Sequence, residues 1–594
     1  MLAHSLLNKA IQEALSKVYS ISVNESEITL QKTRKEFEGD FTLVTFPYIK
    51  ATKQSPEQVG DALGKFLTEN NKNITKYNVV KGFLNLSLSN DFWLGFFNSE
   101  SSVSNYGFKK EGTSGKTIML EYSSPNTNKP LHLGHIRNNL LGYSVAEILK
   151  TQGHKVIKAN LVNDRGVHIC KSMLAWKKFG NGETPQSSGM KGDHLVGKYY
   201  VAFDKAYKKE IEDLVSGGKT KEEAEKQAPV MLEVQEMLRK WEAGDKETID
   251  LWKMMNGWVY EGMAKTYSTL GVNFDKMYYE SNTYVLGKEI IQEGLAKKVF
   301  YKKDNGSVAI DLSPEGLDEK IVLRSDGTSV YITQDIGTAI ERFKEFPQLN
   351  QLIYTVGNEQ DYHFKVLFKI LEKLGYNWAK ECYHLSYGMV ELPEGKMKSR
   401  EGTVVDADDL LDEMFSTAEQ TTKELGKVEG FSDEELKTLY HTIGSGALKY
   451  FMLKVDPKKK MLFDPKESID FNGHTGPFIQ YTYARIQSVL SKAGNVPTAA
   501  DASVELNELE RELIKLIYEF PSVLEESAKA YNPSLIANYV YELTKSFNRF
   551  YHDYSILKEE NEKVKQMRVM LAKQCSDIIK NGMKLLGIEV PNRM

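Results

Sequence analysis

Apolar residues recur at every third or fourth position in several long stretches of the chain, a spacing that predicts amphipathic helices. We expect one helix over residues 3–19 and another over residues 133–151, which ends before Gly153. Residues 190–270 and most of the chain from about Phe431 onward have the same helical pattern, interspersed with many charges. The pattern therefore predicts a large helical fraction, including a mainly helical C-terminal part.

Shorter runs of β-branched and apolar residues predict strands between these helices. Residues 117–122 and 155–161 flank the helix over 133–151, and the three segments should form a βαβ unit with parallel strands. Four later runs are expected to supply the second half of the same sheet: 308–312, 330–333, 352–356 and 383–387. This alternation predicts an α/β fold with a Rossmann-type parallel sheet.

The length of 594 residues exceeds what one hydrophobic core supports, so we expect several domains. An apolar fraction of 41% and a charged fraction of 27% are typical of a globular protein. The pattern predicts a small α+β N-terminal domain, the sheet domain with a helical insertion, a connecting helical region and an all-α C-terminal domain. Their expected bounds are 1–106, 116–410 with the insertion at about 175–275, 411–462 and 463–594.

The net charge and the cysteine content limit the classes of binding partner and the cellular compartment that we expect. A net charge of −4 means that a nucleic acid, if bound, is held by local basic patches and not by the overall field. The three cysteines, Cys170, Cys382 and Cys575, form no CxxC pair, which is typical of a reducing cytosol. The N-terminus lacks a signal-peptide pattern, and no stretch approaches the ~20 apolar residues of a membrane span. We therefore expect a cytoplasmic protein without membrane attachment.

The strongest chemical signal is the segment Ser-Pro-Asn-Thr-Asn-Lys-Pro-Leu-His-Leu-Gly-His at residues 124–135, which joins a strand to the start of a helix. Free backbone N–H groups and the helix dipole attract an anion there. Gly134 lets a nucleotide approach the backbone, and His132 and His135 share one face of the first helical turn. The four residues His-Leu-Gly-His alone would also fit an ordinary capped helix or a zinc site.

The full segment resembles the HIGH motif of class I aminoacyl-tRNA synthetases in its arginyl-tRNA synthetase form, and the resemblance covers essentially the whole chain. The segment from Gly395 to Thr403 resembles the second class I motif, KMSKS, except that Ser399 stands where the second lysine belongs. Many arginyl enzymes share this departure, and in them a lysine just before the first histidine, here Lys129, is thought to supply the missing charge. The N-terminal domain resembles the additional domain of this family, which contacts the outer corner of tRNA. The insertion would face the acceptor stem.

The resemblance implies that the enzyme activates L-arginine with ATP to arginyl-adenylate and transfers it to the 3'-terminal adenosine of tRNA(Arg), releasing AMP and pyrophosphate. Because the arginine carboxylate is itself the nucleophile, catalysis reduces to in-line positioning and stabilisation of phosphate charge. Mg²⁺ is expected only as part of the ATP substrate, without a tightly bound cofactor. The implied catalytic residues are His132, His135, Lys129, Lys396 and Lys398. The implied ATP-binding residues are Pro125, Leu133, Gly134, His135, Asn138, Gly357, Met397 and Lys398.

Arginine recognition requires carboxylates and planar acceptors, because a guanidinium group presents a rigid fork of donors that matches a carboxylate. Asp335 is our first choice for the guanidinium partner. The positions that match the arginine site of the family are Glu121, Asn126, Tyr331, Asp335, Gln360 and, as a weaker match, Glu280.

Residues 471–486 and the helices after them resemble the anticodon-binding domain of arginyl-tRNA synthetases, and their interleaved aromatic and basic residues suit stacking on unpaired bases. The implied tRNA-binding residues are Asp40, Gln480, Tyr481, Arg485 and Arg549. We expect a monomer. Two alternatives stay open, namely another class I synthetase and a tRNA-free nucleotidyltransferase with the same His-x-Gly-His motif.

Overall fold

The computed structural model describes residues 2–99, 103, 105–284, 286–328, 330–391, 405–426 and 429–594. The chain forms two compact units. The first comprises residues 1–106, 485–521 and 542–579, and the second comprises residues 107–484, 522–541 and 580–594. Within the described ranges, no helix combines the length and the apolar character needed to cross a membrane.

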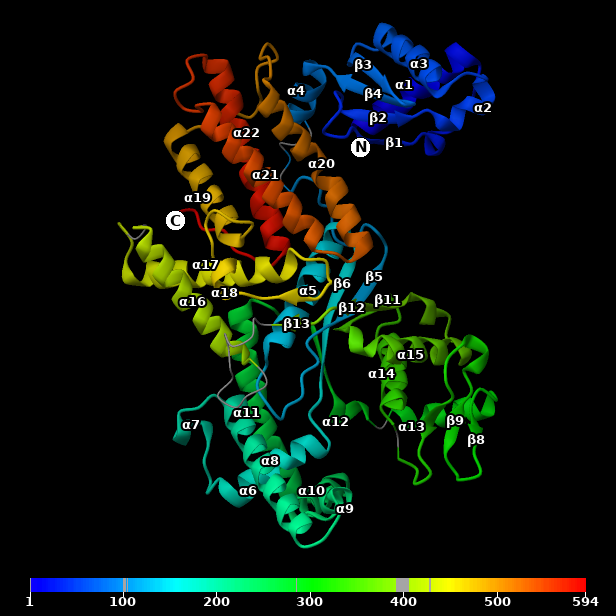
Figure 1. Ribbon diagram of the computed structural model, residues 1–594, viewed down its shortest axis with the longest axis vertical. Coiled ribbons are helices and arrows are strands. Elements are labelled where there is room, and N and C mark those ends of the chain that lie inside the picture. The colour runs from blue at the N-terminus through cyan, green and yellow to red at the C-terminus, as the bar shows by residue number, and fades with distance from the viewer. Residues whose placement is uncertain are drawn as a thin grey trace. The chain divides into compact units, whose positions relative to one another are not determined.

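The second unit is built on a five-stranded parallel sheet in the order β12-β11-β5-β6-β7 (Figure 1). The first of these strands in the chain, β5, lies in the centre, with β6 and β7 on one side and β11 and β12 on the other. This reversal is the switch point of a Rossmann-type sheet, where ligands bind at the carboxyl ends of the strands. The predicted α/β fold is confirmed. The strands are β5 (Thr117–Glu121), β6 (Lys155–Val162), β7 (Lys276–Tyr279), β11 (Leu349–Gly357) and β12 (Cys382–Tyr387).

Helix α5 (Leu133–Thr151) connects β5 to β6 and has the bounds that the sequence predicts. It lies so close to the end of β5 that a side chain at Gly142 would clash with Tyr122. The other half of the sheet is covered by α14 (Tyr331–Glu345) and α15 (Asp361–Lys373). Their buried residues, including Ile336 and Leu367, join those of the strands in one apolar cluster.

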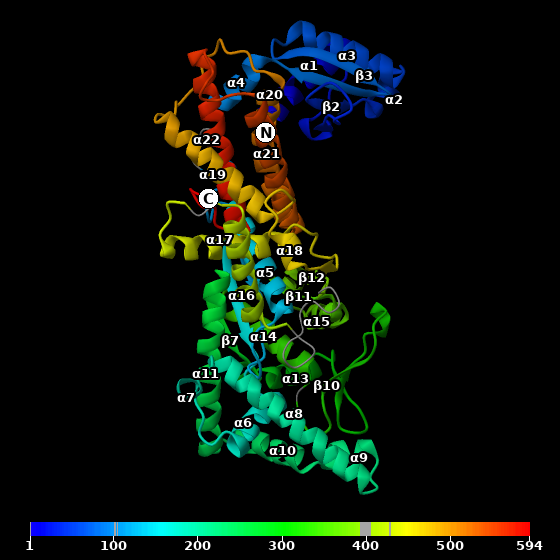
Figure 2. The same ribbon diagram turned by 60° about the vertical axis from the view of Figure 1, so that its left-hand side comes forward.

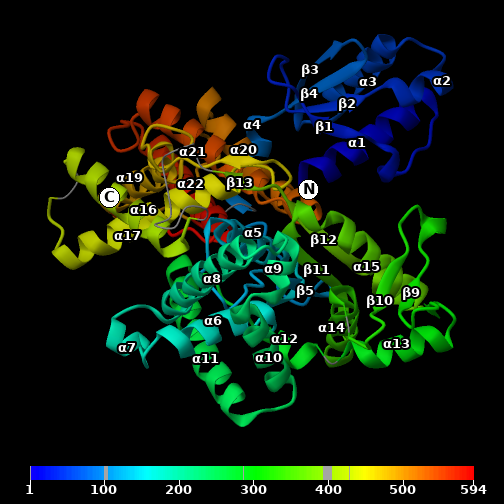
Figure 3. The ribbon, with the colours of Figure 1, turned by 60° about the horizontal axis from the view of Figure 1, so that its bottom comes forward.

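Two strand predictions for the second half of the sheet are wrong. Residues 330–333 do not form a strand, because Tyr331 begins helix α14, whose buried face includes Ile332 and Ile336. The β-branched run favours a strand locally, but burial of this helical stripe outweighs that small preference. The strand predicted at 308–312 exists as β9 (Val308–Ile310), but it belongs to a separate antiparallel sheet of order β10-β9-β8 (Figure 3). Its neighbours are β8 (Tyr301–Lys302) and β10 (Lys320–Leu323).

Between β6 and β7 the chain forms the predicted helical insertion (Figure 2). Helices α8 and α11 pack in direct backbone contact: a side chain at Gly192 would clash with Trp258, and one at Gly262 would clash with Asp193. This contact leaves little room for one helix to shift against the other. The insertion comprises α6 (Val167–Phe179), α7 (Pro185–Ser188), α8 (Gly192–Ser216), α9 (Lys221–Gln227), α10 (Pro229–Glu242) and α11 (Lys246–Leu270).

The chain beyond residue 404 is mainly helical, as the sequence predicts from about Phe431 onward. The other elements of the second unit are α12 (Glu280–Thr283), α13 (Gly287–Ala296), β13 (Val390–Glu391), α16 (Ala407–Glu424), α17 (Asp433–Leu453), β14 (Met461–Leu462) and α18 (Pro465–Ser468). Four more helices contribute segments to both units: α19 (Gly476–Ala493), α20 (Glu508–Ala530), α21 (Ser534–Asp553) and α22 (Glu562–Leu585).

The first unit contains an antiparallel sheet of order β1-β2-β4-β3, as an α+β domain requires. Helix α3 lies against this sheet, and its Gly64 leaves room for the ring of Tyr77. Tyr518 of α20 makes edge contacts with Trp93 and Phe96 in the core of this unit. The elements are α1 (Leu2–Tyr19), β1 (Leu30–Lys32), β2 (Phe41–Val44), α2 (Ile49–Thr52), α3 (Pro56–Asn70), β3 (Ile74–Val80), β4 (Phe83–Leu88) and α4 (Asn90–Ser99).

Candidate active site

The two histidines of the His-Leu-Gly-His segment cap the start of α5, because each ring accepts a hydrogen bond from a backbone N–H group of that segment. The backbone N–H of Gly134 donates to Nδ1 of His132 (3.1 Å), and the backbone N–H of His132 donates to Nδ1 of His135 (3.2 Å). The two ring centroids lie 3.9 Å apart. The imidazoles thus take the place of the Ser/Thr and Glu side chains of a capping box, at a helix end that attracts anions.

This cap determines the tautomer of both rings. Because Nδ1 accepts a hydrogen bond in each ring, the proton of the neutral imidazole is on Nε2, which becomes a donor. Burial, helped by the charge of Lys129, lowers the pKa of His132 to about 4. Burial also lowers the pKa of His135 well below its usual value. Near pH 7, both rings are therefore neutral and carry Nε2–H groups.

The turn between β5 and α5 is held by a buried amide. Ser123 and Ser124 have positive φ angles of 76° and 44°, which non-glycine residues rarely adopt. Asn138 Oδ1 accepts the backbone N–H of Ser123 (2.5 Å), and its Nδ2 donates to the carbonyl of Thr355 in β11 (2.7 Å). Asn138, which the resemblance assigns to ATP, therefore connects the turn to the neighbouring strand across the switch point.

The other residues assigned to ATP lie around the same turn. Pro125 is buried, and its carbonyl accepts the backbone N–H of Asn163 (2.9 Å). Leu133 is buried, whereas Gly134 is partly exposed, and a Cβ at Gly134 would lie 3.1 Å from the His132 ring. Gly357 ends β11 and is partly exposed at the same edge of the sheet. The structure therefore brings these residues together at the carboxyl ends of β5 and β11.

A cavity of about 1010 Å³ lies at the same edge, beyond the ends of β6 and β7. Three residues of the predicted arginine site line it: Asn126, Glu280 and Tyr331. The cavity also includes Arg165, whose guanidinium lies over the Tyr284 ring at 4.0 Å. Arg165 is not among the predicted site residues, although it lies just beyond the second strand of the sheet, where α/β folds place ligand groups.

Two carboxylates of the predicted arginine site interact with charged or titratable neighbours. Asp335 Oδ2 lies 2.6 Å from Nε2 of His363, a partner that the sequence did not predict. Burial raises the pKa of Glu280 to about 7; Arg165 lowers it, and the carboxylates of Asp164 and Asp335 raise it further. A cation near Glu280 would favour its ionised form, which is the expected property of a guanidinium-binding site.

Glu121, the third predicted carboxylate, forms a buried ion pair with Arg342 of α14. The Arg342 side chain is fully buried, and its guanidinium also lies over the rings of Tyr278 and Tyr354. Burial alone lowers the pKa of Arg342, but the neighbouring Glu121 carboxylate outweighs that effect and raises it. Glu121 is therefore committed to an internal cation, which sequence reasoning missed.

The remaining expected residues differ in accessibility. Lys129 is partly exposed beside the histidine pair, and Gln360 is exposed just after β11. The segment that resembles KMSKS, including Lys396, Met397 and Lys398, lies outside the described residues.

The five residues assigned to tRNA fall into two groups. Asp40 accepts the backbone N–H of Leu88 (2.6 Å) and pairs with Lys515, and Gln480 is fully buried among backbone carbonyls. Tyr481 and Arg485 are partly exposed, and Arg549 is exposed. Asp40 and Gln480 are thus engaged within their own units, whereas the other three present surface to solvent.

Comparison with known proteins agrees with this geometry. Residues 100–464 match the family model of the class I tRNA synthetase (R) catalytic domain. Residues 479–594 match the DALR anticodon binding domain, and residues 5–88 match the arginyl tRNA synthetase N terminal domain. The chain is 58% identical to an arginine–tRNA ligase of Flavobacterium psychrophilum over 100% of both chains. It is 57% identical to one of Bacteroides thetaiotaomicron over 98% of each.

Solved structures show the same architecture. Arginyl-tRNA synthetase of Thermus thermophilus superposes with a TM-score of 0.80 at 25% identity, covering 100% of both chains. The Plasmodium falciparum enzyme superposes with a TM-score of 0.77 at 18% identity, covering 100% of this chain and 99% of the other, and supports the fold alone. The switch-point sheet with a His-Leu-Gly-His helix start is that of a class I aminoacyl-tRNA synthetase. Within that class, the chain belongs to the arginyl-tRNA synthetase family, and its activity is that of an arginine–tRNA ligase. This result excludes both alternatives that the sequence left open.

Proposed function

We propose that the triphosphate of ATP binds at the start of α5, where His132 and His135 donate hydrogen bonds through Nε2–H and Lys129 supplies a cation. The mutual cap supports this assignment, because it leaves both Nε2–H groups as donors while Nδ1 is occupied. Gly134 and Gly357 would let the nucleotide approach the backbone. Pro125, Leu133 and Asn138 would act by shaping the turn.

Three residues outside the described ranges complete this proposal. Lys396, Met397 and Lys398 are assigned to the triphosphate because their segment resembles KMSKS. Mg²⁺ would accompany ATP as part of the substrate.

The arginine substrate is assigned to the cavity beyond β6 and β7. Glu280 lines this cavity, and the nearby charge of Asp335 raises its pKa, so the two carboxylates would face the guanidinium together. Asn126 and Tyr331 line the same cavity, and Gln360 lies after the adjacent strand. Glu121 would support the site indirectly, through its buried ion pair with Arg342.

Adenylate formation then requires no protein nucleophile. The arginine carboxylate attacks the α-phosphate, the bond from the α-phosphate to the leaving pyrophosphate breaks, and negative charge grows on the phosphate oxygens. Donors aimed at such charge are worth ~3–4 kcal/mol each in comparable sites. His132 and His135 can act in this way without a change in protonation, because both rings are neutral near pH 7.

The mutual histidine cap is the observation that carries this assignment. The test is arginine-dependent exchange of pyrophosphate into ATP, measured with and without tRNA(Arg). Citrulline and lysine serve as controls, because citrulline lacks the guanidinium charge and lysine lacks the planar fork. We expect exchange with arginine alone among the three amino acids. Equal exchange with citrulline would refute the assignment of Asp335 and Glu280.

The partner in the second step is assigned as tRNA(Arg), with Tyr481, Arg485 and Arg549 as its contacts. Their accessibility supports this role, whereas Asp40 and Gln480 would position neighbouring elements. We further propose that the enzyme acts as a monomer in the cytoplasm. The three cysteines are free and buried, as suits a reducing compartment.

A further inference from the structure

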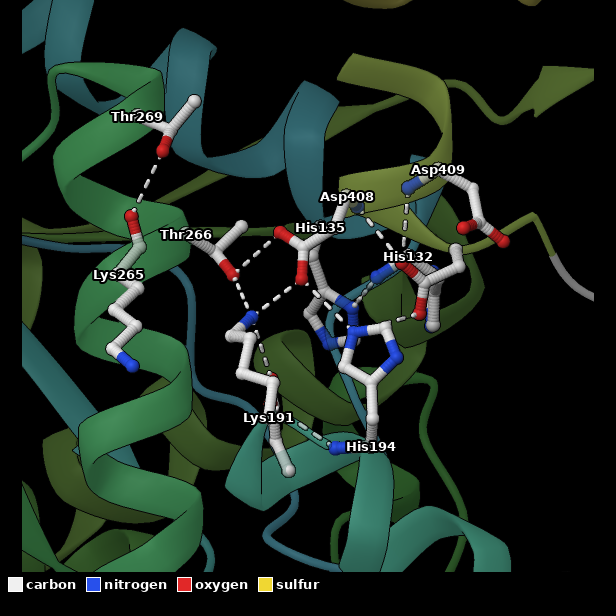
Figure 4. Close-up of polar contacts among 11 residues, drawn as sticks. His132, His135, Lys191, His194, Lys265, Thr266, Thr269, Asp408 and Asp409 are labelled. Carbon is white, nitrogen blue, oxygen red and sulfur yellow. Dashed lines mark hydrogen bonds and ion pairs between the residues drawn. The ribbon is translucent and has the colours of Figure 1, made fainter. Parts of the chain in front are cut away.

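Polar side chains from three distant segments interact with one another beside the start of α5, and Figure 4 shows Lys191, His194, Thr266 and Asp408 among them. Helix α8 and the residue before it supply Lys191, Asp193 and His194, α11 supplies Thr266, and the first turn of α16 supplies Asp408. We name this group the Asp408 cluster.

Both carboxylate oxygens of Asp408 are engaged. Oδ2 accepts from Nζ of Lys191 (2.5 Å) and lies 2.9 Å from Nε2 of His194. Oδ1 accepts from the hydroxyl of Thr266 (2.9 Å), which itself accepts from Nζ of Lys191 (2.6 Å). Asp408 is thus bound to both long helices of the insertion, which themselves pack in backbone contact at Gly192 and Gly262.

A metal ion is not needed to explain the cluster. Asp193, His194 and Asp408 have ligand atoms within 4.8 Å of one another, a spacing that would suit a cation. However, Nζ of Lys191 also lies 3.1 Å from Oδ2 of Asp193, so the ammonium group of Lys191 already sits between the two carboxylates where a cation would bind. We therefore treat the Asp408 cluster as a link between elements.

The link continues from Asp408 to the histidine pair. Residues 405–407 run antiparallel to residues 131–133: Leu133 N–H donates to the carbonyl of Val405, and Ala407 N–H donates to that of Leu131, both at 3.0 Å. Between these bonds, His132 faces Asp406, whose side chain accepts the N–H of Asp408 (2.8 Å). A shift of Asp408 would therefore displace the backbone on which His132 is held.

We propose that Asp408 is a positioning residue for adenylate formation, because it fixes residues 405–407 against residues 131–133 and so holds His132 where the phosphates bind. This inference rests on the proposed role of His132. It gives the helical insertion a direct mechanical connection to the proposed ATP site.

The first test compares Asp408→Asn with Asp409→Asn, its exposed neighbour on the same helix. Both variants remove one negative charge, but only Asp408 binds the insertion. In arginine-dependent pyrophosphate exchange at saturating tRNA, we expect kcat to fall about tenfold for Asp408→Asn, with an unchanged KM for arginine. Asp409→Asn should keep wild-type kcat. An equal loss in both variants, or none in Asp408→Asn, would overturn the proposal.

A double variant tests whether Asp408 acts through His132. If it does, Asp408→Asn should cost almost nothing further in a His132→Ala background. A merely structural contribution would instead lower kcat by the same factor in both backgrounds, and that result would refute positioning. If His132→Ala itself retains wild-type kcat, the proposed function fails. If His132→Ala lowers kcat but the Asp408 variants keep wild-type kcat, only this inference fails.

Thr266 supplies a milder perturbation in case Asp408→Asn does not fold. Thr266→Val removes the hydroxyl that joins Lys191 to Asp408, whereas Thr266→Ser keeps it. We expect a measurable fall in kcat for Thr266→Val and recovery in Thr266→Ser. Thr269→Val, about one turn further along α11 at an exposed position outside the Asp408 cluster, is the control and should keep wild-type kcat. Identical kcat values for Thr266→Val and Thr266→Ser would contradict the proposal.

Discussion

At the residue scale, the start of α5 shows how a backbone cap can fix the tautomer of two side chains. The N–H groups of Gly134 and His132 occupy Nδ1 of the two rings, and burial keeps both rings neutral. The same contacts that begin the helix therefore select the Nε2–H tautomer. Helix capping and the proposed phosphate recognition therefore depend on one pair of residues.

Substitutions at His132 can separate these two roles. His132→Asn retains a good helix cap but loses the donor at the Nε2 position. We expect adenylate formation in single turnovers to slow about a hundredfold, with little change in melting temperature or in the KM for arginine. His154→Asn, outside the site, is the control. A near-normal rate in His132→Asn would contradict the role of Nε2–H.

The pKa of Glu280 predicts how arginine affinity depends on pH. Its pKa of about 7 in the free enzyme means that it is largely protonated at pH 6 and ionised at pH 8. A guanidinium favours the ionised form, so arginine affinity should rise from pH 6 to pH 8, by up to about tenfold. Arginine titrations at both pH values measure this change. Glu280→Gln should flatten the dependence, whereas an unchanged slope in that variant would assign the titration to another group.

At the element scale, one face of helix α14 supplies residues of the proposed arginine site. Tyr331, Asp335 and Arg342 stand at spacings of four and seven residues, which place them along one side of the helix. Tyr331 lines the cavity, Asp335 pairs with His363, and Arg342 reaches Glu121 beneath the sheet edge. The helical assignment of this segment therefore matters for function, because a strand would have placed successive side chains on opposite faces.

Asp335→Asn tests the contribution of this helix. The variant keeps the size of the side chain but removes the charge that we assign to the guanidinium. Because hydrogen-bonded recognition of a polar group can discriminate by ~10⁴, we expect the KM for arginine to rise about a hundredfold or more. The KM for ATP should change little. Asp361→Asn, at the start of the neighbouring helix α15, is the matched control, and equal losses for both substrates would assign Asp335 to structure.

At the scale of the second unit, the C-terminal segment packs against the helix that begins with the histidine pair. Ser144 of α5 donates to the carbonyl of Leu585 (2.8 Å), and Nζ of the buried Lys449 donates to that of Gly587 (2.6 Å). Gln480 donates to the carbonyl of Glu589 (2.8 Å). The end of the chain is therefore an internal support of the catalytic unit.

Removal of residues 586–594 should destabilise this unit. It leaves the buried Lys449 ammonium without its carbonyl partner, at a cost of about 1–3 kcal/mol, and removes one of the two carbonyls that accept from the Gln480 amide. We expect a lower melting temperature and a lower rate of pyrophosphate exchange, measured by thermal unfolding and by the exchange assay. Removal of Met594 alone is the control. A wild-type melting temperature in the longer truncation would show that these contacts contribute little.

The sequence by itself determined the features that depend on neighbouring residues. Helical periodicity located α5 at residues 133–151, and the twelve-residue segment at 124–135 identified the enzyme class. These features depend on helix periodicity and capping, which act within a few residues. The same local criteria failed for Val330 to Thr333, where packing of the helix against the sheet outweighed β-branched composition.

Only the tertiary structure decided which distant polar groups meet. Glu121 pairs with Arg342 across 221 residues, and Asp408 meets His194 across 214. Nothing in the local pattern around either carboxylate specifies its partner, because such pairs depend on how helices pack on the sheet. A carboxylate in the protein interior that lost its partner would lower the stability of the fold, because an unpaired buried charge is unfavourable. Residue types and spacing thus identified the candidate groups of the site, and packing determined which of them are available to substrate and which hold the site in place.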